Sequence, residues 1–143
     1  MRVQDFVKKN VTTVRRDTSI QEVARKMSEE DIGFLPVIDE SGKPVGTITD
    51  RDIVVRLLAK GGDLKNARVE QAMTKEVVSV RPDEDIGRVA GLMKDRKISR
   101  ILVCDQSGKP VGVISLGDLA ERHEEEDVGR TVKEVKEGTT LTH

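Results

Sequence analysis

An internal repeat with a fixed offset of 66 residues constrains this sequence more than any other feature. Residues 42–46, Gly-Lys-Pro-Val-Gly, recur as residues 108–112, and the alignment of the two copies runs without a gap from residues 3–56 to residues 69–122. Of these 54 aligned pairs, 22 are identical. Two copies, rather than three or more, favour a closed pseudo-twofold pair over an open solenoid.

Each copy predicts the same order of secondary-structure elements. A short β-branched strand near Val14 or Val80 precedes an apolar stripe at helical spacing. The stripe consists of Ile20, Val23, Ala24 and Met27 in the first copy and of Ile86, Val89, Ala90 and Met93 in the second. Two apolar strands then flank an Asp-x-Ser-Gly turn, at 35–38 and 45–49 or at 101–104 and 111–115. A last helix begins near Asp50 with an apolar face, and short helices at 4–8 and 70–74 precede the copies.

These elements predict a mixed α/β (α+β) fold. We expect two pseudo-twofold related β-α-β-β-α motifs that pack through their sheets as one compact module, because each copy is too small to bury much surface alone. The expected boundaries are 1–62 for the first motif with its short N-terminal helix, 63–68 for a linker and 69–123 for the second motif. Residues 124–143 form an acidic break and an accessory tail that contains spaced valines.

Composition excludes several classes of function. The 25 Lys and Arg nearly balance the 26 Asp and Glu, and only two residues are aromatic, both Phe. A nucleic-acid binding surface of basic and aromatic side chains is therefore not expected. One cysteine and two histidines cannot build a disulfide or a Cys- or His-rich metal centre. No apolar run suits a membrane span or a signal peptide, so we expect a soluble, cytoplasmic protein with no required cofactor.

Catalysis has little support in the sequence. The common nucleotide-hydrolase, dinucleotide-binding, serine-hydrolase and zinc-protease motifs are absent. Cys104 falls in a predicted buried strand, where a thiol is ordinarily inert. His123 follows the last repeated residue and is expected on the surface. We therefore do not expect an enzyme.

The junction between the last strand and the last helix of each copy is the candidate for function. Thr49 or Ser115 ends the strand, and Asp52 or Asp118 follows three positions later. One interpretation is a plain helix start, with a hydroxyl N-cap and a carboxylate near the positive end of the helix dipole. The other is a nucleotide site, in which free amides and a hydroxyl hold a phosphate while the carboxylate accepts hydrogen bonds from a ribose. The sequence leaves both open.

The sequence resembles a tandem cystathionine-β-synthase (CBS) domain pair, or Bateman module, in three features. These are the gapless repeat, the turn Asp-x-Ser-Gly-Lys-Pro-Val-Gly, and the repeated pattern Gly-h-h-Thr/Ser-x-x-Asp, in which h is an apolar residue. The resemblance covers about residues 1–123. It implies that clefts between the copies bind an adenosine ligand such as AMP, ADP, ATP, S-adenosylmethionine or NAD(H). It also implies a homodimer that regulates a separate target protein. The alternative is a structural dimer whose clefts bind nothing.

The resemblance further implies that each cleft mixes residues of both copies. The first site would contain Thr47, Ile48, Thr49, Asp50, Arg51, Asp52, Val78, Ile98, Ser99 and Arg100. The second site would contain Thr12, Ile32, Gly33, Phe34, Val113, Ile114, Ser115 and Asp118. Two arginines, Arg51 and Arg100, suit the first site to a phosphorylated nucleotide. The second site keeps the ribose carboxylate without an arginine, so we expect it to be weak, empty or selective for a less charged compound.

Overall fold

A computed structural model describes residues 1–7, 11–122 and 135, and these residues form two compact units. The first-copy unit consists mainly of residues 11–77. The second-copy unit consists mainly of residues 78–122, together with residues 1–7 and Val135. Each unit is described separately below.

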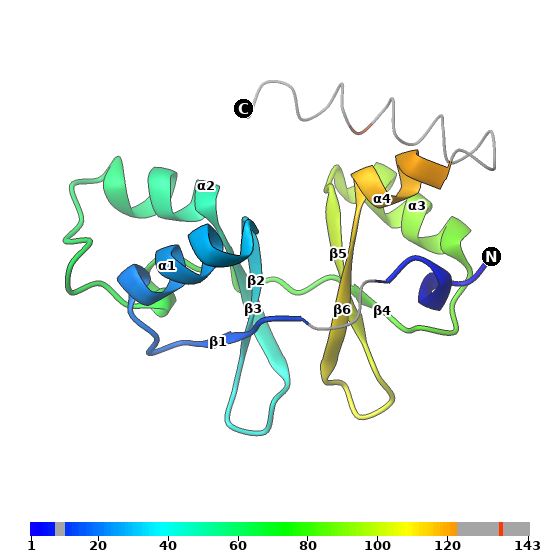
Figure 1. Ribbon diagram of the computed structural model, residues 1–143, viewed down its shortest axis with the longest axis horizontal. Coiled ribbons are helices and arrows are strands. Elements are labelled where there is room, and N and C mark those ends of the chain that lie inside the picture. The colour runs from blue at the N-terminus through cyan, green and yellow to red at the C-terminus, as the bar shows by residue number, and fades with distance from the viewer. Residues whose placement is uncertain (8–10, 123–134, 136–143) are drawn as a thin grey trace. The chain divides into compact units, whose positions relative to one another are not determined.

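The first-copy unit contains a three-stranded sheet and its helices (Figure 1). Its elements are β1 (Val14–Arg15), α1 (Ile20–Glu30), β2 (Phe34–Ile38), β3 (Pro44–Thr49), α2 (Asp50–Asp52), the π-helical segment η2 (Ile53–Leu58) and the 3-10 helix η3 (Val69–Gln71). Strand β1 pairs with β2 in parallel, and β2 pairs with β3 as an antiparallel hairpin. The crossover through α1 makes the parallel pairing possible.

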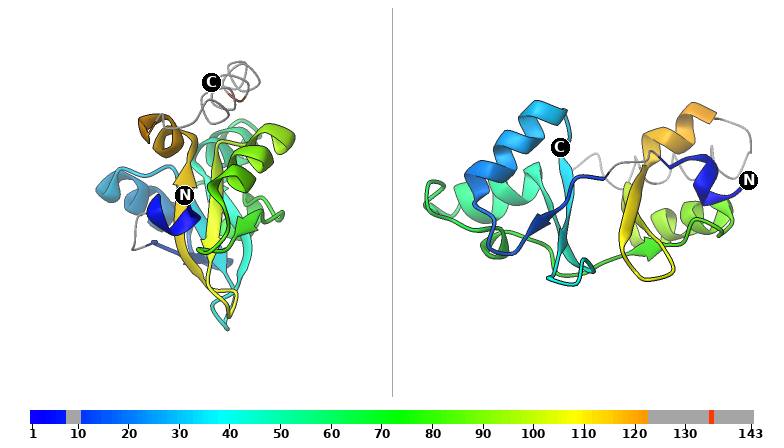
Figure 2. Two further views of the ribbon diagram at one scale, coloured as in Figure 1. Left: turned by 90° about the vertical axis from the view of Figure 1, so that its right-hand side faces the viewer. Right: turned by 60° about the horizontal axis from the view of Figure 1, so that its bottom comes forward.

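The second-copy unit repeats this arrangement. Its elements are the 3-10 helix η1 (Val3–Asp5), β4 (Ser79–Val80), α3 (Ile86–Arg96), β5 (Arg100–Cys104), β6 (Pro110–Ser115) and α4 (Leu116–Arg122). The sheet order is β4-β5-β6, and β4 pairs with β5 in parallel. In each unit the long helices cover one face of the sheet (Figure 2). The mixed α/β fold and the strand–helix–strand–strand–helix order predicted from the sequence are confirmed.

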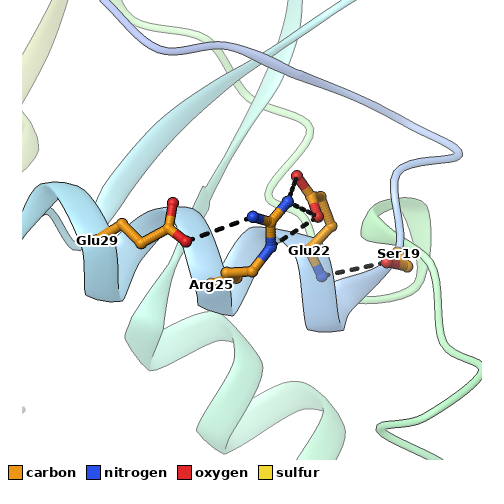
Figure 3. A network of polar contacts seen from close by, with 4 residues as sticks. All are labelled: Ser19, Glu22, Arg25 and Glu29. Atoms are coloured by element: carbon orange, nitrogen blue, oxygen red, sulfur yellow. Dashed lines mark hydrogen bonds and ion pairs between the residues drawn. The ribbon is translucent and has the colours of Figure 1, made fainter.

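Helix α1 begins and ends at residues that satisfy its free backbone groups. The Ser19 hydroxyl accepts a hydrogen bond from the Glu22 amide at 3.1 Å, and the chain leaves the helix at Asp31 in the left-handed region (φ 54°). On the exposed face, Arg25 bonds both Glu22 and Glu29 (Figure 3), and the hydrogen bond from Arg25 lowers the pKa of Glu22. Such exposed pairs stabilise a helix only slightly. The buried face of α1 is what holds it to the sheet.

The predicted apolar stripes form the two cores, with one exception. Ile20, Val23 and Met27 are buried in the first-copy unit, and the four corresponding residues of α3 are buried in the second. Ala24 is exposed, whereas its counterpart Ala90 is buried. The methyl group of an alanine contributes little on burial, so the spacing alone did not fix its side of the helix.

The last helix of the first copy differs from its expected apolar face. Leu57 is buried, but Val54 and Leu58 are 52% and 53% exposed, and Val55 is 41% exposed. The segment carrying these residues is π-helical, whereas α4 is a regular α-helix. A π-helix is closed by hydrogen bonds between residues five apart, whereas an α-helix is closed by bonds between residues four apart. Its side chains therefore do not follow the 3.6-residue stripe that the sequence predicts.

The two short N-terminal helices are 3-10 helices at Val3–Asp5 and Val69–Gln71, shorter than predicted. Each packs on the other copy. The Val3 amide donates to the Glu84 carbonyl at 2.9 Å, and the Val69 amide donates to the Thr18 carbonyl at 2.9 Å. Both valines are fully buried. Each core therefore contains a segment that precedes the opposite copy in the sequence. Val135, the one described residue of the tail, is also buried in the second-copy core.

Gly46 in β3 allows a close approach of the segment that leads out of the first copy. The amides of Thr47 and Thr74 each donate to the other's carbonyl, at 2.9 and 2.8 Å. A Cβ atom at Gly46 would overlap both the Met73 side chain and the Thr74 carbonyl. The glycine is therefore required by packing.

We predict that Gly46→Ala lowers the free energy of unfolding by about 1–3 kcal/mol, because backbone atoms of residue 74 cannot move aside without breaking their pairing. Urea denaturation measures this change. Gly91→Ala is the matched control: this glycine lies within α3 with open space around it, so alanine should stabilise the protein by about 0.5–1 kcal/mol. Equal effects of the two substitutions would contradict the packing assignment.

Candidate functional site

The first-copy corner is the junction of β3 and α2, residues 49–52. The Thr49 hydroxyl accepts a hydrogen bond from the Asp52 amide at 3.0 Å, and the Thr49 amide donates to Asp52 Oδ2 at 3.0 Å. This reciprocal pair is a capping box, which satisfies amide groups at the start of the helix. The corner is partly buried, and its carboxylate is fixed in place by the backbone.

The second-copy corner, residues 115–118, has the same geometry. The Ser115 amide donates to Asp118 Oδ2 at 2.9 Å, and the Asp118 amide donates to the Ser115 hydroxyl at 3.1 Å. The helix-start interpretation is therefore confirmed at both corners. It does not exclude the ligand interpretation, because each capping box uses one carboxylate oxygen and leaves Oδ1 for another partner.

At the first-copy corner, Asp52 Oδ1 already has protein partners. The Thr74 hydroxyl donates to it at 3.3 Å, and Arg56 Nε lies 3.5 Å away. The Asp52 side chain is only 12% exposed. Sequence analysis did not include Thr74 or Arg56 in the site. The Asp52–Arg56 spacing of i, i+4 is a signal that could have identified Arg56, whereas the repeat gives no signal for Thr74, because position 8 is lysine.

Within each unit the segment that enters the second strand lies beside the corner of its own copy. Phe34 pairs with Thr49 across the β2–β3 hairpin, and the Asp50 amide donates to the Gly33 carbonyl at 3.1 Å. In the second copy the Leu116 amide donates to the Ser99 carbonyl at 2.7 Å. These contacts bring together the parts of the predicted sites that belong to one copy. The predicted mixing of residues from both copies stays a prediction.

Two predicted site residues cannot present their side chains to a ligand. Ile48 and Ile114 are fully buried in the cores of their units, so only their backbone groups are available to a ligand. Val113 on β6 and Ile32 before β2 are partly buried, and Ile98 packs against the second-copy core. The side chains of Ile48 and Ile114 therefore belong to the cores that support the corners.

Thr12 and Val78 occupy equivalent positions before the first strand of each sheet, and they form different hydrogen bonds. The Thr12 hydroxyl donates to Glu30 at 2.5 Å. In the second copy the Leu102 amide donates to the Val78 carbonyl at 3.2 Å. Pro36 takes the place of Leu102 in the first copy and has no amide hydrogen, so that bond has no equivalent there.

Charge also distinguishes the two corners. In the first copy the Asp50 carboxylate lies over Gly33, where a Cβ atom would come within 2.8 Å of Asp50 Oδ2, and Arg51 is exposed. In the second copy, buried Leu116 and exposed Gly117 take the places of Asp50 and Arg51. Arg100, at the start of β5, is exposed. The first-copy corner therefore has two more charged side chains than the second, whose polar side chains are Ser115 and Asp118.

Groups that could support other chemistry are few in the described part of the chain. Cys104 is buried as expected, and this burial raises the pKa of its thiol. Residues 1–7, 11–122 and 135 contain no cluster of three or more potential metal ligands. None of the helices described is long and apolar enough to cross a membrane. His123 lies outside the described residues.

A hollow of about 520 Å³ lies at the opposite end of the first-copy sheet from the corner. Its lining is formed by Arg15, Arg16, Asp17, Ile38, Asp39, Glu40 and Ser41. Oδ1 of Asp39 accepts hydrogen bonds from the backbone and hydroxyl of Ser41, and the hydroxyl bond is the main reason why the pKa of Asp39 is lowered. This hollow is separate from the predicted sites.

Comparison with known proteins identifies the repeated unit. The family model described as CBS domain matches residues 3–59 and again residues 69–125. A CBS domain-containing protein of Bacillus subtilis, YhcV, is 37% identical over 118 residues, which are 82% of each chain. A homoserine O-acetyltransferase of Methanohalobium evestigatum is 35% identical over 86% of this chain. The chain spans only 24% of that enzyme's length, and 60% of an uncharacterised Methanopyrus kandleri relative.

Solved structures show the same architecture. A conserved CBS domain protein of Thermoplasma acidophilum, TA0289, has a TM-score of 0.81 and 26% identity, covering 96% of this chain and 76% of that protein. The CBS domain pair of protein MJ0100 has a TM-score of 0.76 and 32% identity, covering 85% of this chain and 94% of that one. The MJ0100 pair was solved in complex with 5′-methylthioadenosine and S-adenosyl-L-methionine.

The capping boxes predict a measurable stability difference in the absence of any ligand. Ser115→Ala and Thr49→Ala should each lower the free energy of unfolding by about 1 kcal/mol, because each removes the acceptor for a helix-start amide. Ser115→Thr and Thr49→Ser keep the hydroxyl and should retain wild-type stability. Thermal unfolding of the four variants tests this prediction. If the conservative variants lose as much stability as the alanine variants, the cause is packing and not the hydrogen bond.

Proposed function

Because the chain belongs to the CBS-domain family, we propose that it is a regulatory module that binds an adenosine-containing ligand at its two corners. The observation that carries this proposal is the capping box, which occurs at both corners with nearly the same distances. Each box holds a carboxylate rigidly at the end of a strand and leaves Oδ1 facing other groups. The bound adenosine compounds of the MJ0100 pair, at 32% identity, support the ligand class.

The corner chemistry suits a nucleoside. A carboxylate oxygen can accept hydrogen bonds from the two neighbouring hydroxyls of a ribose, and these bonds to a charged group are stronger than neutral ones. Arg51 at the first-copy corner and the exposed Arg100 are the cations that we assign to a phosphate. We therefore propose that the Asp52 site takes phosphorylated nucleotides. The Asp118 site would take a less charged adenosine compound.

We propose regulation rather than catalysis at the corners. In each corner the hydroxyl accepts a hydrogen bond from the aspartate amide, and one carboxylate oxygen accepts from the amide of the hydroxyl residue. The acetyltransferase activity of the longer relative is not carried over to this chain, which matches only a quarter of that enzyme. We propose that the module acts in the cytoplasm on a separate target protein and requires no cofactor.

A thermal-shift panel of AMP, ADP, ATP, S-adenosylmethionine and NADH tests the ligand class. A compound at a hundred times its dissociation constant should add about 2.7 kcal/mol of stability. No shift with any of the five compounds would favour the alternative of a structural dimer with non-functional clefts. A shift with S-adenosylmethionine or NADH alone would reassign the ligand within the adenosine class.

Substitutions at the two carboxylates test the difference between the sites. Asp52→Ala should weaken AMP binding about ten- to a hundredfold, since it removes hydrogen bonds to a charged group, whereas Asp118→Ala should affect AMP much less. Isothermal titration calorimetry measures both. Asp95→Ala, at an exposed position of α3, is the control and should bind AMP like the wild type. Equal losses at Asp52 and Asp118 would refute the assignment of phosphate to the first site.

We further propose that two chains associate through the exposed apolar residues of η2, Val54, Val55 and Leu58. These are three of the five large apolar side chains that are exposed among the described residues. The same stretch carries Asp50 and Arg51 at its start and Arg56 and Lys60 toward its end, while Asp52 is nearly buried and lies beside Arg56. Antiparallel pairing of two copies would bury the apolar face.

Light scattering of the purified protein tests this dimer. Val54→Glu combined with Leu58→Glu should convert a dimer to a monomer, because two carboxylates would be buried without partners. Ala24→Glu adds a charge at an exposed position of α1 and should leave the dimer intact. A monomeric wild-type protein, or a dimer that persists in the double variant, would contradict the proposed interface.

A further inference from the structure

Two residues outside the predicted site converge on the carboxylate oxygen that the first capping box leaves open. The Thr74 hydroxyl donates to Asp52 Oδ1 at 3.3 Å, and Arg56 Nε lies 3.5 Å from the same atom. With the Thr49 amide on Oδ2, both oxygens of this nearly buried carboxylate have partners. A ribose that binds Asp52 must therefore compete with groups of the protein itself.

The same two residues connect Asp52 to the segment that leads toward the second copy. Arg56 Nη1 donates to the Met73 carbonyl at 3.3 Å. The two main-chain hydrogen bonds between Thr47 and Thr74 then fix residues 73–74 along the edge of β3. Because Gly46 admits this segment at close range, the position of the Thr74 hydroxyl is set by backbone pairing as well as by its own bond.

The bond from Thr74 is the weak point of this arrangement. Hydroxyl-to-oxygen hydrogen bonds are typically about 2.7–2.8 Å long, and the observed 3.3 Å is well above that range. A ligand hydroxyl at the usual distance would form a stronger bond to the same oxygen. Arg56 could remain in place, since a carboxylate oxygen has two lone pairs and Arg56 approaches through its side-chain nitrogen.

We propose that Thr74 and Arg56 are positioning residues for Asp52, and that a ligand diol replaces the Thr74 hydroxyl at Oδ1 and loosens the pairing of residues 73–74 with β3. This inference rests on the proposed function. It adds a specificity rule and a route of regulation. A compound with both ribose hydroxyls can displace Thr74, whereas a 2′,3′-dideoxy compound cannot. The loosened residues lie four and five positions before Val78, where the main segment of the second-copy unit begins, so binding at one copy changes the chain that enters the other.

Calorimetry with AMP tests the competition. Thr74→Val keeps the shape of the side chain and removes the hydroxyl, so we expect about two- to tenfold tighter AMP binding, the value of one weak hydrogen bond to a carboxylate. Thr74→Ser restores the hydroxyl and should restore wild-type affinity. Binding of 2′,3′-dideoxy-AMP should not tighten in Thr74→Val, because this analogue does not compete for Oδ1.

Amide hydrogen exchange tests the coupling. AMP should speed exchange at the amides of Thr47 and Thr74 in the wild type, and 2′,3′-dideoxy-AMP should not. In the absence of ligand, Arg56→Gln should speed exchange at residue 74 through loss of the Met73 contact. Arg25→Gln is the control: it removes an arginine of similar exposure that is ion-paired on α1.

The outcomes separate this inference from the proposed function. If wild type binds none of AMP, ADP, ATP, S-adenosylmethionine and NADH, both are overturned. If wild type binds AMP and Asp52→Asn abolishes binding, the function stands. Unchanged or weaker binding by Thr74→Val would then overturn the competition. Slower or unchanged exchange at residues 47 and 74 on addition of AMP would overturn the coupling.

Discussion

In each copy, a hydroxyl residue at the end of a strand and an aspartate three positions later form a reciprocal pair of hydrogen bonds. This pair determines both where the last helix starts and where the candidate site lies. In each copy it starts the last helix, because it satisfies amides that would otherwise lack partners. It also fixes the carboxylate where a strand ends, a helix starts and a neighbouring segment approaches. Thr49 with Asp52 and Ser115 with Asp118 show that one interaction serves both stability and a candidate binding site.

The repeat made most of the fold predictable. Two aligned copies supply each apolar stripe twice, so Val23 with Val89 and Met27 with Met93 indicate a helix face more firmly than either copy alone. The hairpins followed from the turn chemistry of Asp39 and Gly42, whose positive φ of 86° favours glycine. Gly108 repeats this conformation at 84°. Where both copies agree and the chemistry is local, the sequence was sufficient.

What could not be predicted depends on contacts between segments distant in the sequence. Thr74 reaches Asp52 because Gly46 admits residues 73–74 to the edge of β3, and no local pattern encodes that approach. The exposure of Val54 and Leu58 follows from a π-helical backbone that the apolar spacing does not indicate. The candidate corners were predictable as a motif. The different environments of the two corners were predictable only in part, from the presence of Arg51 in the first copy where the second copy has Gly117.

The exchanged 3-10 helices have a consequence for how such a pair can evolve and be divided. Val3 completes the core around Ile86, and Val69 completes the core around Ile20. A cut between the repeats would leave each half with the wrong valine: the first half would carry Val3 without a core to fill, and the second would carry Val69 in the same state. Neither half thus carries all the residues of its own core, and each repeat depends on the other for one buried valine.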